Sequence, residues 1–227
     1  ASYLYYLEGV DVIVIDCDDR QHSQKDYREN DLNVTGENPY LKRVMQNFYR
    51  NFGKKAYEII LSNPAEAAKV AVERLDEGAN PQVVFFDITG TVNDIEIVKL
   101  LSVMDYLFVP ITTDTADMKS SIRFASHVVN NMITTGKTKI KEVNLVWNRV
   151  PSKAKTRLCG IIDNYLDELG LHSLDTVLAN SSRFFKDGAP VGKVGMFRST
   201  MLPPDKRLLK GSNLPELVAE IRKIINV

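Results

Sequence analysis

Short runs of β-branched, aliphatic and aromatic residues alternate along the chain with longer stretches in which apolar side chains recur every three or four positions. The short runs are typical of strands buried on both faces of a parallel sheet, and the longer stretches of amphipathic helices. The alternation predicts right-handed crossovers and a mostly parallel, twisted sheet with helices on both faces, a three-layer α/β sandwich. The strand-like runs are Val10–Asp16, Ala56–Leu61, Val83–Ile88, Tyr106–Ile111, Val143–Asn148 and Asp175–Leu178.

Helical patterns fill most of the spaces between these runs. One helix is predicted over Pro64–Glu77, because Asn63 is a good N-cap and proline suits the first helical position. No internal repeat and no linker interrupts the pattern, so one domain over residues 1–227 is predicted. The other expected helices are one that ends near Gly9, Pro39–Tyr49, Asp114–Thr134, Ser152–Leu169 and Leu214–Ile225.

Charge and cysteine content narrow the class of protein. The chain has 29 basic and 29 acidic residues, so only a local basic patch could attract nucleic acid. Cys17 and Cys159 show neither metal-binding spacing nor a disulfide framework, which favours the reducing cytoplasm. No apolar run approaches the ~18–20 residues of a membrane span, so no membrane partner is expected. The first residues, ASYLYYLEG, do not have the pattern of a signal peptide.

Aspartates close two of the strand-like runs. Asp16 and Asp18 follow VDVIVI, and Asp87 follows QVVFF and begins the sequence Asp-Ile-Thr-Gly. Ligands of open α/β sheets bind at the carboxyl ends of strands, and an acid of the form Asp-x-x-Gly is where P-loop NTPases hold Mg²⁺. Two acids two residues apart also need a cation or hydrogen-bond donors to balance them. The pattern indicates a Mg²⁺–phosphate site, although each acid alone also fits a turn or a solvated strand end.

Four segments, in this order, resemble the ParA/MinD family of deviant-Walker ATPases. VIVIDCDDRQHS is similar to the segment after that family's second strand, and QVVFFDITGT falls where the family has its Walker B strand. MDYLFVPITTDTADMKSS and VNLVWNRV resemble two later strands of the family. The beginning of the chain is most similar to TraA-like ParA homologues carried by conjugative transposons. The implied fold is that of P-loop NTPases.

The resemblance implies a role for each matching residue. Asp18 would position the water that attacks the γ-phosphate, and Asp16 would be a second acid beside the phosphate-loop lysine and Mg²⁺. Asp87 would bind Mg²⁺ through water. Gly90 would belong to the switch segment that senses the γ-phosphate, and Asn148 would lie beside the adenine. The residues after Asn148 lack the second acid of the guanine-binding N-K-x-D motif, which favours ATP over GTP.

The family's first strand and its glycine-rich loop with a lysine would precede residue 1. We therefore expect the printed chain to begin after the Walker A loop and to lack the N–H groups and lysine that bind phosphates. The segment GAPVGKVG at 188–195 contains glycine and lysine, but it has no strand–loop–helix context and is expected to be a surface loop.

The implied function is that of a ParA-like ATPase in partition, conjugative transfer or its regulation. Such a protein uses ATP and Mg²⁺, forms a homodimer when ATP is bound, binds DNA nonspecifically, and acts with a ParB-like or conjugation partner protein. A candidate contact for DNA phosphates lies in the C-terminal third, where Asp187 and Asp205 dilute the basic charge, so a solvated face is an equal alternative. Its candidate residues are Arg198, Lys206, Arg207 and Lys210.

Two other functions stay open. The first is an interaction module of the same fold that has lost its phosphate loop and binds no nucleotide. Retention of Asp16, Asp18 and Asp87 argues against it, because no nucleotide would then require these acids. The second is a metabolic enzyme of this fold, such as one similar to dethiobiotin synthetase. The two cysteines do not provide the cluster ligands of an enzyme similar to the nitrogenase iron protein.

Overall fold

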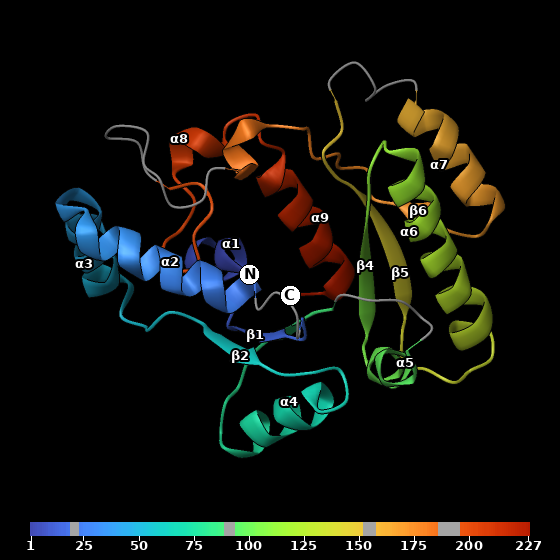
Figure 1. Cartoon of the computed structure of the whole chain (residues 1–227), viewed down its shortest axis with the longest axis horizontal. Helices are drawn as coiled ribbons and strands as arrows, with labels where there is room; N and C mark the ends of the chain where they lie inside the picture. The colour runs from blue at the N-terminus through green and yellow to red at the C-terminus, as the bar shows by residue number, and fades with distance from the viewer. Residues whose placement is uncertain (19–22, 89–93, 152–157, 186–195) are drawn as a thin grey trace. The chain divides into compact units, whose positions relative to one another are not determined.

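The computed structural model describes residues 1–18, 23–88, 94–151, 158–185 and 196–227. Its contacts fall into two compact units, and each is described here by itself (Figure 1). The first unit contains Ala1–Thr89 and Ser182–Lys210, and the second contains Gly90–Ser181 and Gly211–Val227. The single domain expected over 1–227 stays a prediction.

The first unit is built on a parallel sheet of three strands in the order β2-β1-β3. These strands are β1 (Val12–Asp16), β2 (Glu58–Leu61) and β3 (Val83–Asp87), each within a run predicted from the sequence. The central strand β1 is buried along its whole length, as its unbroken run of β-branched residues predicts. The buried sheet therefore fixes the positions of Asp16 and Asp87, which are the last residues of β1 and β3.

Helices surround this sheet. The helix α1 (Ser2–Leu7) precedes β1, and α2 (Ser23–Glu37) and α3 (Pro39–Phe52) fill the long polar connection to β2. Asn38 caps α3, since its side-chain oxygen accepts the N–H groups of the second and third helical residues. The helix α4 (Ala67–Asp76) begins three residues later than predicted, because the residues after Asn63 form a turn. A 3₁₀ turn (Ser182–Phe185) and α8 (Lys206–Leu209) complete the unit.

An aromatic cluster packs α1 against α3, and a hydrogen bond from it reaches the segment around Thr200, before α8. Tyr6 contacts Phe48 and Phe52 with ring centroids 5.4 and 5.5 Å apart, in edge-to-face arrangements. The Tyr6 hydroxyl donates a hydrogen bond of 2.8 Å to the carbonyl oxygen of Thr200. Segments almost two hundred residues apart in the sequence thus share one core.

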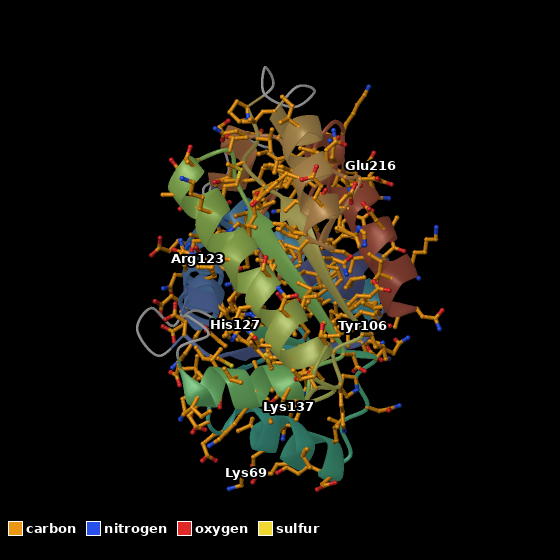
Figure 2. All side chains as sticks on the ribbon, turned by 90° about the vertical axis from the view of Figure 1, so that its right-hand side faces the viewer. Lys69, Tyr106, Arg123, His127, Lys137 and Glu216 are labelled. Atoms are coloured by element: carbon orange, nitrogen blue, oxygen red, sulfur yellow. The ribbon has the colours of Figure 1, made fainter. Side chains whose placement is uncertain are left out.

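The second unit has a parallel sheet in the order β4-β5-β6, formed by Tyr106–Ile111, Glu142–Trp147 and His172–Ser173. One face of this sheet is covered by α9 (Leu214–Ile225), in a core that includes Val146 and Leu217. On the other face lie α6 (Thr115–Val128) and α7 (Leu158–Glu168) (Figure 1). Figure 2 shows Arg123 and His127 along α6. The helix α5 (Ile95–Ser102) precedes β4.

The sixth predicted strand is wrong in its position. The structure has strand residues at His172–Ser173 instead of Asp175–Leu178. The N–H groups of Asp175 and Thr176 donate to the two carboxylate oxygens of Glu220 on α9, at 2.7 and 3.0 Å, so they are not available to a strand ladder. The chain returns to β5 only where the Leu178 N–H donates to the Trp147 carbonyl, at 2.9 Å.

Two predicted helices of the second unit differ from the structure in their bounds. The helix predicted over Asp114–Thr134 ends at Val128 and continues as a π-helical turn over Val129–Ile133. Residues 152–157 of the predicted helix Ser152–Leu169 lie outside the described residues. None of the helices in the described ranges combines the length and the apolar character that a membrane crossing requires.

Candidate functional site

The carboxyl ends of β1 and β3 place Asp16 and Asp87 side by side. The two residues are direct partners in the parallel ladder, and the Cys17 N–H donates to the Asp87 carbonyl at 2.9 Å. Asp16 is 1% exposed, and Asp18, which follows β1, is 6% exposed. The structure therefore brings together at one sheet edge the three acids that the sequence predicted there.

The buried carboxylate of Asp16 is balanced by backbone donors. Its Oδ1 accepts the N–H of Asp18 at 3.2 Å, and its Oδ2 accepts the N–H of Gln24 at 2.9 Å. Gln24 lies in the first turn of α2, where N–H groups lack helical partners and the helix dipole favours a negative charge. Asp16 therefore fixes the start of α2 against the end of β1.

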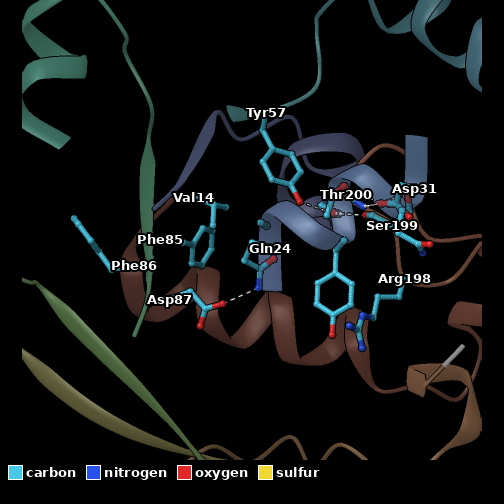
Figure 3. Close-up of a pocket in the computed structure, with 14 residues that line it drawn as sticks. Val14, Gln24, Asp31, Tyr57, Phe85, Phe86, Asp87, Arg198, Ser199 and Thr200 are labelled. Carbon is cyan, nitrogen blue, oxygen red and sulfur yellow. Dashed lines mark hydrogen bonds between the residues drawn. The ribbon is translucent and has the colours of Figure 1, made fainter. Parts of the chain in front are cut away.

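Asp87 is bound by a side chain instead. The Gln24 amide donates from Nε2 to Asp87 Oδ2 at 2.7 Å, as the dashed line in Figure 3 shows. Gln24 thus contacts both acids, Asp16 through its backbone and Asp87 through its side chain. Asp87 Oδ1 accepts no hydrogen bond from any residue that the structure describes. One oxygen of this half-buried carboxylate is therefore available to a ligand.

These groups fit a Mg²⁺ ion held in part by water and by a ligand. Mg²⁺ is commonly bound by one or two carboxylates together with waters and phosphate oxygens, rather than by an all-protein cage. Asp87 offers Oδ1, whereas both oxygens of Asp16 are occupied by backbone N–H groups. Within the described ranges no group of three or more His, Cys, Asp or Glu side chains could hold a metal ion. The residues fit a site centred on one carboxylate.

The sequence predicted two further residues for the nucleotide site, Gly90 and Asn148. Gly90 is outside the described residues. Asn148 directly follows β5 in the second unit, where it is half-buried and its N–H donates to the Ile111 carbonyl at 2.8 Å. Its place beside an adenine stays a prediction.

A cavity of about 400 Å³ opens beside Asp87 within the first unit (Figure 3). Strand residues, the first turns of α2 and the segment before α8 line it. Its volume lies within the range of about 300–1,000 Å³ that small-molecule sites occupy. The wall combines apolar, aromatic and charged side chains, including Val14, Gln24, Tyr27, Phe85, Asp87 and Arg198.

The four basic residues predicted to contact DNA have different surroundings. The Arg198 guanidinium lies over the Tyr27 ring, 3.9 Å from its centroid, and is part of the cavity wall. Arg207 donates from Nε and Nη2 to the Asp205 carboxylate at 3.0 and 2.7 Å, which compensates its charge locally. Lys206 and Lys210 are exposed at the two ends of the α8 segment.

A buried polar network that the sequence did not predict joins α2 to the segment before α8. Asp31 is 3% exposed, and its Oδ2 accepts the Thr200 N–H at 2.6 Å and the Thr200 hydroxyl at 2.8 Å. Arg28 donates from Nε to the Thr200 hydroxyl and from Nη2 to the Tyr57 carbonyl, at 2.8 and 3.0 Å. Burial raises the pKa of Asp31, and the bonds from Thr200 and the Arg28 charge oppose that rise.

The one sequence signal for this network is spacing. Gln24, Arg28 and Asp31 stand at positions i, i+4 and i+7, which share one face of a helix. Nothing in the sequence shows that the partner of this face is Thr200, because that residue is 169 positions from Asp31.

The comparisons with known proteins support the fold. No family model matches the chain, and no curated protein matches it. Among solved structures it is similar to a chain of the MinC:MinD cell division protein complex of Aquifex aeolicus. The TM-score is 0.51 and the identity 15%, over 84% of this chain and 78% of that chain. Likeness at this identity concerns the fold, and it confirms the predicted class of parallel sheets flanked by helices. The chain therefore shares with this matched chain an α/β fold of parallel sheets flanked by helices.

Proposed function

We propose that this protein is an ATPase of the ParA/MinD type that uses Mg²⁺ and ATP at the edge formed by Asp16, Asp18 and Asp87. The observation that carries the proposal is the pairing of Asp16 with Asp87 at the ends of β1 and β3, with Asp18 buried two residues farther on. An ordinary pair of solvated strand ends would leave these acids in water. The MinD-like fold supports nucleotide as the ligand of this edge.

Each acid has a separate role in this proposal. Asp87 would hold Mg²⁺ through Oδ1, directly or through water, and the bound ion would neutralise charge on the phosphates. Asp18 would orient the attacking water. Asp16 would act through its neighbours, because its two oxygens hold the Asp18 N–H and the first turn of α2. Gly90 and Asn148 would contact the γ-phosphate and the adenine.

Asp87→Asn and Asp18→Asn in the full-length protein test this division. We expect Asp87→Asn to weaken Mg²⁺-dependent ATP binding about tenfold or more, because it removes a charged ligand already used in the ground state. Asp18→Asn should keep ATP affinity and lower kcat by about 100-fold or more, because a water-positioning group acts in the transition state. Calorimetric titration and steady-state turnover measure the two effects. Asp26→Asn, which changes an exposed acid of the nearby helix α2, is the control. Equal loss of ATP binding in both site variants would contradict these roles.

We further propose that ATP binding makes a homodimer that binds DNA nonspecifically and serves partition or conjugative transfer with a ParB-like or conjugation partner. The neutral chain needs a local patch for DNA, and a dimer would present that patch twice. A salt series of DNA binding, with and without ATP, compares the parent with a variant that lacks the charges of the four residues. The control lacks three exposed charges of α3. The four residues are Arg198, Lys206, Arg207 and Lys210, and the control residues are Lys42, Arg43 and Arg50.

If removal of the four charges lowers affinity and the steepness of the salt dependence while the control does not, the patch binds DNA. If the four-charge variant matches the parent in both quantities, the basic residues are a solvated face, and the DNA-binding part of the proposal fails.

A second candidate is a nucleotide-free interaction module of the same fold. It is favoured by one observation, namely that each oxygen of Asp16 accepts a backbone N–H and Asp87 accepts the Gln24 amide, so both acids have hydrogen-bond donors without a ligand. In that case the full-length protein would bind no Mg-ATP, and Asp87→Asn would change no binding property.

A further inference from the structure

The position of Gln24 gives it a specific relation to Asp87. Its side chain reaches from the first turn of α2 to the end of β3, and its amide binds only one of the two carboxylate oxygens, Oδ2. Because the donor approaches from α2, the carboxylate cannot rotate freely about its last bond. Oδ1 is thereby held in one direction and accepts no bond from the described residues.

Three residues of α2, the helix that carries Gln24, make hydrogen bonds to other segments of the first unit. The Gln24 N–H binds Asp16, Arg28 binds the Thr200 hydroxyl, and Asp31 binds the Thr200 N–H. These three residues lie on one helix face, at i, i+4 and i+7. The Asp31 contacts are buried, so water does not compete for them. The amide of Gln24 is therefore placed by a fixed element rather than by a mobile loop.

We propose that Gln24 is a positioning residue that aims Asp87 Oδ1 at a divalent cation and gives the site its preference for Mg²⁺. The inference rests on the proposed function, because it assumes that Asp87 binds a cation. Ligating carboxylates are commonly oriented by a second hydrogen bond, and loss of such a partner costs about 10- to 100-fold in metal affinity. Mg²⁺ requires near-ideal octahedral geometry, whereas Ca²⁺ accepts flexible coordination, so fixed aim favours Mg²⁺.

Gln24→Met removes the amide and keeps the length and helical preference of the side chain, so it tests the inference. The full-length protein is titrated with Mn²⁺ in the presence of a non-hydrolysable ATP analogue, with free Mn²⁺ followed by its EPR signal. Mg²⁺ and Ca²⁺ are then used as competitors. Gln46→Met, at an exposed position of α3, is the matched control, and Asp87→Asn identifies the site.

We expect Gln24→Met to lower Mn²⁺ and Mg²⁺ affinity about tenfold and Ca²⁺ affinity by clearly less, so that the ratio of Mg²⁺ to Ca²⁺ affinity falls. A merely structural role would lower the melting temperature without changing this ratio. Parent-like affinity and ratio in Gln24→Met overturn the inference, and so does tighter Mn²⁺ binding, which would make the amide a competitor of the cation.

The failure of the inference and the failure of the proposed function give different results. If the parent binds Mn²⁺, Asp87→Asn abolishes the binding and Gln24→Met leaves it unchanged, the proposed function stands and Gln24 has no positioning role. If the parent and Asp87→Asn bind Mn²⁺ equally, or neither binds it, Asp87 is not a cation ligand and both fail.

Discussion

The two units place acids near the ends of parallel strands in different ways. In the second unit, Asp114 follows β4 and accepts the N–H groups of Ala116 and Asp117 at the start of α6, at 2.9 and 3.1 Å. In the first unit, Asp16 closes β1 and accepts an N–H of α2 from a residue eight positions away. Asp114 is exposed, whereas Asp16 is buried.

The difference separates a local helix cap from a functional candidate. A cap such as Asp114 serves its own helix and needs nothing beyond water and two N–H groups. Asp16 and Asp87 are instead drawn together from two strands, and one of them keeps an oxygen without a donor among the described residues. An acid after a strand is thus informative about function only when its partners come from other elements and leave part of it unused.

The largest expected effect is the difference in unfolding free energy between a substitution of Asp16 and one of Asp114. Asp16→Ala leaves two N–H groups without acceptors at a buried position, and we expect the free energy of unfolding to fall by about 2–4 kcal/mol. Asp114→Ala removes an exposed cap and should cost about 1 kcal/mol. Denaturant unfolding followed by circular dichroism measures both. Equal losses would show that Asp16 is an ordinary cap and would remove the contrast between the units.

A second acid of the second unit tests whether that unit uses acids for structure alone. Asp163 Oδ1 accepts the indole N–H of fully buried Trp147 at 2.8 Å and the Ser173 hydroxyl at 2.7 Å. We expect Asp163→Ala to cost about 1–3 kcal/mol, because the indole N–H loses its acceptor. Asp163→Asn retains an oxygen at this position and should cost less.

Denaturant unfolding followed by tryptophan fluorescence measures these stability losses. The signal reports on the second unit, because Trp147 is the only tryptophan of the chain. Divalent-cation affinity should be unchanged in both Asp163 variants. A loss of cation affinity comparable to that of Asp87→Asn would show that Asp163 is more than a structural acceptor.

The strands were predictable because burial on both faces leaves little choice of residue. The run Tyr106–Ile111 is a strand over the predicted residues, and β1 and β3 lie within their predicted runs. The position of β6 was not predictable, because the apolar residues of 175–178 also suit an irregular segment. What prevents a ladder there is Glu220, which lies on a helix more than forty positions farther along the chain.

The candidate site was predictable only in its acids. Asp16 and Asp87 follow strands, and parallel strands end at a common edge, so their proximity follows from the pattern. Gln24 gave no such signal, because α2 is polar along most of its length and the apolar pattern predicted no helix over its residues. Its contact with Asp87 spans 63 positions and depends on where α2 packs. The sequence cannot specify that packing without the tertiary structure.

The smallest expected effect concerns Asp31, whose buried carboxylate lies near the positive charge of Arg28. Burial raises the pKa of Asp31 above its ordinary value of 3.8, although the Thr200 bonds and Arg28 oppose the rise. Between the unfolded and folded pKa values the native state binds more protons than the unfolded state, so the Asp31 contribution to stability falls as pH rises. Asp31→Asn keeps an acceptor for Thr200 and cannot titrate. The free energy of unfolding of the parent minus that of Asp31→Asn should therefore decrease as pH rises above 3.8, as denaturant unfolding across pH measures.

In an Arg28→Met background the decrease should extend to higher pH, because the charge that opposes the raised pKa is gone. If the difference increases with pH, Asp31 is stabilised as a charged group, and Arg28 with the Thr200 donors outweighs burial in this network.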